Sequence, residues 1–189
     1  MRTGLKKINK EYKGIMLLLR EHGATEVKCI DAADVIVDER VRLKCRVPVC
    51  DSYNKNLMCP PHVISVAEFR TALALFSKAI LVQVSAPVGD TSANVFGPAK
   101  KLHELINLGE KKAFEEGFRF ATGFIGGCCR LCDECVAVHD GKLCRFPFKA
   151  RPSMEAVGID VFATLARVGL SASFPVGDRV EWTGLILID

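Results

Sequence analysis

The sequence predicts an α/β or α+β fold: a single domain over residues 1–189, with helices around a mixed sheet of about four or five strands and cysteine-rich loops. The first observation is composition. Of the 189 residues, 49% are apolar and 25% are charged, which supplies one core and argues against a disordered chain. The second is that helical apolar patterns alternate with short Val- and Ile-rich runs. The third is that eight of the nine cysteines fall in two short windows between those segments.

The first quarter of the chain predicts a helix followed by short strands. Residues 5–22 place leucine and isoleucine side chains on one helical face, and Gly23 follows as a residue suited to a left-handed helix end. Residues 24–30 and 35–37 are rich in Val and Ile. We therefore expect two short strands there.

The middle of the chain predicts two helices and two strands. Ser65 and Glu68 form an S-x-x-E capping box at the start of the first helix. Residues 79–86 are a near-continuous run of Ile, Leu and Val, so we expect a central strand buried on both faces. An amphipathic pattern predicts a long helix over 98–116, and residues 118–125 read as the strand that leads into the second cysteine window.

The last part of the chain predicts helices and a final strand. Pro152 fits a first helical position, and Arg151 beside it is placed to bond nearby backbone or cluster sulfurs. Asp160 can cap a further helix that ends at Gly169. Residues 182–188 are an apolar strand.

Charge and apolar runs exclude several classes of partner. The net charge of +4, from 26 basic and 22 acidic residues, is too small to predict nucleic-acid binding. No apolar run approaches the ~18 residues that cross a bilayer, and the basic amino end leads into no export signal. We expect a cytoplasmic protein with no membrane partner; the oligomeric state stays open.

The second window carries the strongest chemical signal. Four of its cysteines, called the quartet below, are Cys129, Cys132, Cys135 and Cys144. Their C-x2-C-x2-C-x8-C spacing crowds three thiolates within seven residues, as in the C-x2-C-x2-C run of bacterial ferredoxins, whose fourth cysteine follows at a different spacing. The spacing predicts a [4Fe–4S] cluster. Zinc, usually held by two separated cysteine pairs, is the alternative, and disulfides would need an oxidising compartment.

The first window predicts a second metal site and leaves it incomplete. Its three thiols are Cys45, Cys50 and Cys59. A fourth ligand could be a water, a substrate at an open position, or one of three side chains: His62, Cys29 or Cys128. Because Cys128 directly precedes Cys129, it cannot easily serve the same cluster; it is a spare or faces elsewhere. The site could hold a second cluster.

Enzyme signatures are absent from the sequence. There is no nucleophile apart from the cysteine windows, no P-loop, no G-x-G-x-x-G after a strand and no H-E-x-x-H. We therefore assign no catalytic residue and expect an electron carrier or accessory protein rather than an independent enzyme.

Five stretches together resemble a prokaryotic cysteine-rich family of predicted metal-binding proteins, a domain of unknown function. They are K-C-x4-C followed by M-C-P-P at 44–61, C-R-L-C-x2-C at 129–135, C-R-x-P at 144–147, A-R-P-S-M-E-A-V-G-I-D at 150–160 and G-L-I-L-I-D at 184–189. The resemblance spans roughly residues 24–189 and implies metal or iron–sulfur binding in the cytoplasm of an anaerobe.

The leading functional hypothesis is an iron–sulfur protein that passes single electrons to a partner redox enzyme. One alternative is a non-redox module in which zinc at the same cysteines stabilises loops for a protein contact. Another is an iron–sulfur enzyme or maturation factor that binds a small ligand at an open position of the first-window site.

Overall fold

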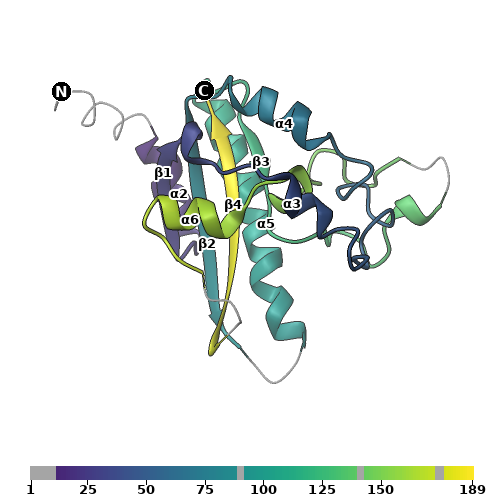
Figure 1. The fold of residues 1–189 in the computed structure, drawn as a ribbon. Coiled ribbons are helices and arrows are strands. Elements are labelled where there is room, and N and C mark those ends of the chain that lie inside the picture. The colour runs from purple at the N-terminus through teal and green to yellow at the C-terminus, as the bar shows by residue number, and fades with distance from the viewer. Residues whose placement is uncertain (1–11, 89–91, 140–142, 173–176) are drawn as a thin grey trace.

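A four-stranded sheet organises the part of the chain that the computed structural model describes, residues 12–88, 92–139, 143–172 and 177–189 (Figure 1). The strands lie in the order β1, β2, β4, β3. Their bounds are Glu26–Asp31 for β1, Lys78–Pro87 for β2, Thr122–Phe124 for β3 and Arg179–Ile188 for β4. The α/β or α+β class is confirmed.

The four strands pair antiparallel throughout, where we expected a mixed sheet. The reason is the position of β4, which lies between β2 and β3 and runs opposite to both. Strands β2 and β3 share a direction and are joined through a helix, but β4 separates them. Among the described residues, parallel pairing is limited to an isolated bridge between Ile125 and Ser153.

Strand β2 is central and buried on both faces, as its apolar run predicts. Ile80 and Val82 point into one core, whereas Ala79 and Leu81 point into the other. Because successive side chains of a strand alternate between faces, this run supplies both cores at once.

One face of the sheet is covered by α2 (Lys13–Glu21) and α5 (Ser92–Glu115). The first predicted helix is confirmed over its described part, residues 1–11 lying outside it, and Gly23 ends it with a φ of 100°. Helix α5 begins six residues before the predicted start at 98 and includes Pro98. A proline at this position has no N–H to donate to the preceding turn, and the helix continues through it.

The other face is covered by α4 (Val66–Leu73), α6 (Val161–Arg167) and the short turns η1 (Ala32–Asp34) and η3 (Glu155–Val157). Both predicted caps are confirmed. The Ser65 hydroxyl accepts from the Glu68 N–H, and the Glu68 carboxylate accepts from the Ser65 N–H. The Asp160 carboxylate accepts from Ala163 N–H at 2.9 Å.

Three local predictions are wrong, two because of pairing with distant residues and one because of a turn. Residues 35–37 form no strand; Val37 makes one isolated bridge to Ile159. The strand predicted at 118–125 is limited to β3, since Ala121 N–H bonds Phe118 O in a turn. Pro152 starts no helix, because its carbonyl accepts from Ile125 N–H and extends the sheet edge.

The two cysteine windows occupy loops beside this scaffold. The first follows α3 (Glu39–Leu43), and the second follows β3 and contains η2 (Val136–Val138). Figure 1 shows both loops at the side of the molecule away from β1. None of the helices in the described ranges combines the length and apolar character needed to cross a bilayer.

Candidate metal centre

Asn56 ties the two cysteine windows together. This residue is buried, and its side-chain Nδ2 donates to the carbonyl oxygen of Cys129 at 2.8 Å. Its Oδ1 accepts from Met58 N–H at 3.0 Å, which fixes the orientation of the amide. Leu57 N–H, the next donor along the loop, reaches the Cys135 sulfur at 3.4 Å. The first window therefore helps to position the second.

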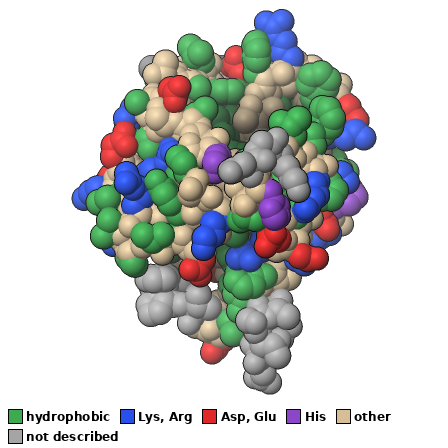
Figure 2. Space-filling view, turned by 90° about the vertical axis from the view of Figure 1, so that its right-hand side faces the viewer, with side chains coloured by type: hydrophobic (Ala, Val, Ile, Leu, Met, Phe, Trp, Pro, Cys, Tyr) green, Lys and Arg blue, Asp and Glu red, His purple; other side chains and the backbone are tan. Residues whose placement is uncertain are grey.

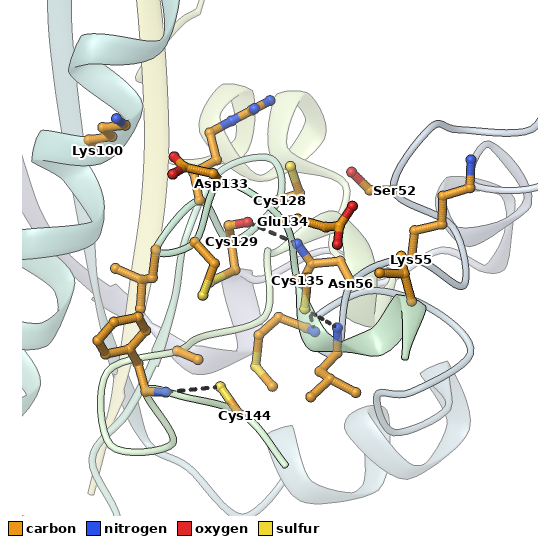
Figure 3. A pocket seen from close by; sticks show the side chains of 18 of the residues that line it. Ser52, Lys55, Asn56, Lys100, Cys128, Cys129, Asp133, Glu134, Cys135 and Cys144 are labelled. Atoms are coloured by element: carbon orange, nitrogen blue, oxygen red, sulfur yellow. Dashed lines mark hydrogen bonds between the residues drawn. The ribbon is translucent and has the colours of Figure 1, made fainter. Parts of the chain in front are cut away.

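All four quartet cysteines line one cavity of about 620 Å³, called the quartet cavity. In Figure 3 the sulfur atoms of Cys129, Cys135 and Cys144 surround a common space, whereas the Cys128 sulfur points away from them. The quartet residues are all partly buried. The structure thus brings together the residues that the spacing predicts to act together.

Backbone amides are directed at the quartet sulfurs. Besides the Leu57 donor to Cys135, Phe146 N–H lies 3.4 Å from the Cys144 sulfur (Figure 3). Leu131 N–H bonds the Cys129 thiol, and this contact lowers its pKa. Amide donors of this kind stabilise negative sulfur and tune metal-bound thiolates.

Burial is the largest influence on the Cys129 pKa and raises it. The Leu131 N–H opposes that shift, and the charges of Cys144, Cys132 and Cys135 raise it again. The thiols are therefore near enough to repel one another when ionised. A cation among them would reverse this repulsion, because a metal favours the deprotonated thiolate.

Within the described ranges, no group of three or more His, Cys, Asp or Glu side chains is already arranged to hold a metal ion. The quartet shares a cavity wall and does not form a preset coordination sphere. Ligation would have to draw the loop side chains together, as is common where metal binding is coupled to local folding.

A second cavity of about 600 Å³ is lined by the three first-window cysteines together with Cys128. It is called the Glu155 cavity, after the carboxyl residue in its wall. Cys128 also lines the quartet cavity and so stands between the two. Of the other candidates for a fourth ligand, Cys29 lies on β1 opposite Ile80, and His62 is exposed; neither lines these cavities.

Two glycines shape the approach to Cys128. A β-carbon on Gly126 would lie 2.8 Å from Thr183 O, and one on Gly127 would lie 2.8 Å from the Trp182 ring. Gly127 also has a φ of 70°, in the left-handed region. Without β-carbons, these two glycines allow the backbone to lie close to β4 just before Cys128 and Cys129.

The Glu155 carboxyl is a feature of the site that sequence analysis did not select. Its Oε2 atom is buried and has no hydrogen-bond partner. Burial raises the pKa of this carboxyl, while its own N–H, the Ser153 hydroxyl and the Gly127 N–H oppose the shift. The residue lies in the A-R-P-S-M-E-A stretch, whose spacing indicates no ligand.

The loop after the quartet is held to α5 by two polar anchors. Arg151 forms a two-point ion pair with the Glu110 carboxylate, at 2.8 and 2.6 Å, and donates to Ala150 O. It thus bonds backbone, as expected, but pairs with a carboxylate rather than a sulfur. The second anchor is Lys149 O, which accepts from the buried His103 ring and from Asn107.

The surroundings of the windows carry charge of both signs. Figure 2 shows basic, acidic and hydrophobic side chains mixed on the face that bears the loops. The Arg130 guanidinium lies 3.8 Å from the centre of the Phe96 ring. Arg145 donates to Glu134 O at 2.9 Å. Lys142, another basic residue of this window, lies outside the described residues.

Comparison with protein families gives one result. The profile of the family described as "Predicted metal-binding protein (DUF2284)" matches residues 28–188. No curated protein and no solved structure matches the chain.

Proposed function

This chain belongs to the family of predicted metal-binding proteins, and we propose that its quartet holds a [4Fe–4S] cluster that passes single electrons to a partner redox protein. The observation that carries the proposal is the shared cavity, in which four thiols meet backbone amides aimed at sulfur. Metal binding rests on the family; the cluster and its redox role are our inference.

The donor set fits an iron–sulfur cluster. Cluster sites use cysteine thiolates at several corners, and three quartet members within one tight loop supply them. The cavity of about 620 Å³ gives ample room. When bound, such a cluster stores and releases one electron at a time.

The chain's own residues would set the electronic environment. Leu57, Leu131 and Phe146 present N–H groups to three of the four sulfurs, which lowers the cost of negative charge there. Partial burial of the thiols limits water near the sulfur atoms. Hydrogen bonding and exposure are two of the factors that fix a cluster's potential.

A redox partner would need to approach the quartet closely. Next to Cys144 the apolar side chains of Leu143 and Phe148 are 89% and 91% exposed. Exposed apolar groups of this size are typical of contact surfaces. We place the partner on this side of the quartet cavity.

Metal analysis of protein purified under anaerobic conditions tests the proposal. We expect iron and acid-labile sulfide in equal amounts, a brown colour and a paramagnetic signal after reduction. Cys132→Ser should lose this cluster, whereas Cys29→Ser, which alters a cysteine outside both cavities, should keep it. A colourless protein with stoichiometric zinc and no sulfide would replace the redox proposal with a zinc-stabilised module.

A further inference from the structure

A second set of cysteine side chains lines the Glu155 cavity. Cys59 is buried, Cys45 and Cys128 are partly buried, and Cys50 is exposed at the rim. The three first-window cysteines and Cys128, which follows β3 in the chain, therefore line one cavity. The sequence analysis named Cys128, Cys29 and His62 as candidate side chains for a fourth ligand. Of these three, Cys128 lines the cavity.

These thiols interact electrostatically. Burial raises the pKa of Cys59 to about 12, and the charge with the largest additional effect is that of Cys128, followed by those of Cys50, Cys45 and Cys129. Burial also raises the pKa of Cys45, to which Cys50 and Glu155 contribute. Charge on the neighbouring groups therefore adds to the effect of burial at Cys59 and Cys45.

The Glu155 carboxyl is an independent sign of a ligand. A buried polar atom without a partner is costly, and buried charges in proteins are normally paired or bound to metal. Oε2 is such an atom, and its residue lines the same cavity as the four thiols. The basic residues in the lining are Lys44 and Arg130, and the latter's guanidinium lies over Phe96.

We propose that the Glu155 cavity is a second, separate metal centre in which Cys128 completes the first-window cysteines and Glu155 contacts the bound centre. The ligand class is a thiophilic metal, either iron with sulfide or zinc, since thiolates select both. This centre goes beyond the electron-carrier proposal and does not depend on what the quartet binds.

Consecutive residues would then serve different centres. Cys128 ligates in the Glu155 cavity and Cys129 in the quartet cavity, while Asn56 fixes the Cys129 carbonyl from the first window. Adjacent cysteines cannot easily bind the same cluster, and in this arrangement Cys128 and Cys129 bind different ones. It also explains why Cys128 points away from the quartet sulfurs (Figure 3).

The test compares metal content among single variants of the full chain. Iron, sulfide and zinc are measured per protein after anaerobic purification and again after reconstitution with iron and sulfide or with zinc alone. We expect wild type to hold two centres. Cys128→Ser and Cys50→Ser should each lose one centre, roughly half of the bound metal if both hold the same kind. Cys29→Ser is the matched control and should lose none.

Cys50 is exposed, so Cys50→Ser should fold like wild type, and circular dichroism checks this. A loss of metal in this variant can then be attributed to the missing thiol. In both variants the quartet's spectrum should persist, and the additional Cys132→Ser substitution should remove it. Full metal content in both single variants would overturn the proposal, as would loss of the quartet's signal in Cys128→Ser. Zinc in place of iron at the quartet would defeat the electron-carrier proposal but leave this one standing.

Discussion

The Asn56 side-chain amide donates a 2.8 Å hydrogen bond to the carbonyl oxygen of Cys129, which lies 73 positions further along the chain. With the Leu57 N–H bond to the Cys135 sulfur, this contact means that the quartet's geometry depends on the first window. Substitution of Asn56 should therefore alter the positions of the quartet cysteines, although Asn56 is not a proposed ligand.

Asn56→Ala should weaken both folding and metal retention. The free energy of unfolding should fall by about 1–3 kcal/mol, because buried polar groups lose their partners. Chelator competition should remove quartet metal faster than from wild type. Asn56→Asp keeps the acceptor for Met58 N–H but cannot donate to Cys129 O, so it should resemble Asn56→Ala. Wild-type retention in both variants would show that the contact does not position the quartet.

Arg151→Ala should be the most destabilising of these substitutions. The Arg151 and Glu110 side chains are 18% and 19% exposed, so removing the arginine leaves a largely buried carboxylate without its counter-charge, with the Gly123 N–H still bonded to it. Breaking a buried pair in this way costs about 3–5 kcal/mol. Urea denaturation measures the loss. Arg151→Lys should lose less, since it keeps the charge without the two-point geometry. A change below about 1 kcal/mol in Arg151→Ala would contradict this assignment.

His103 should make stability depend on pH. Burial lowers its pKa in the folded protein, the bond to Lys149 O opposes that shift, and nearby Arg151 adds to it. In the unfolded chain the ring titrates near 6.5. Its contribution is therefore complete above about pH 6.5 and is lost as pH falls, because the unfolded state takes up the proton first.

The matched variant is His103→Gln, which keeps a side-chain donor for Lys149 O without a titrating ring. Denaturation between pH 7.5 and 5 should show a smaller fall in stability than wild type. Identical slopes for the two proteins would mean that His103 does not control this range.

Glu155→Gln should weaken metal binding in the Glu155 cavity by roughly 10-fold, because residues that support metal ligands typically contribute 10–100-fold to affinity. Competition with a chromophoric chelator measures this, and quartet metal should be unaffected. Glu134→Gln is the control, since Glu134 lines the quartet cavity as an exposed carboxylate paired with His139. Equal affinities for Glu155→Gln and wild type would exclude contact between Glu155 and the metal.

Local signals predicted the parts of the fold that local interactions decide. The caps at Ser65 and Asp160 satisfy the first N–H groups of their own helices, and the apolar run of β2 reports burial directly. Residues 35–37 and Pro152 were mispredicted because distant partners, Ile159 and Ile125, determine their backbone.

In the candidate site, too, local spacing predicts some features and long-range packing determines others. Spacing grouped the quartet, and its four members line one cavity, while their role as metal ligands stays a prediction. The side to which Cys128 turns depends on how Gly126 and Gly127 pass Trp182, which spacing does not encode. Glu155 gave no signal, because a lone glutamate in a short turn is ordinary until its surroundings are known.

The position of Cys128 and Cys129 at consecutive places in the chain has a thermodynamic consequence. Their Cα atoms are about 3.8 Å apart, so anchoring one sulfur restricts where the other can go. If both proposed centres bind metal, the one that fills first orders the backbone for its neighbour and lowers the entropic cost of the second binding step. Such linkage is reciprocal, so occupancy of the two proposed centres should rise with weak cooperativity that still lets each centre fill alone.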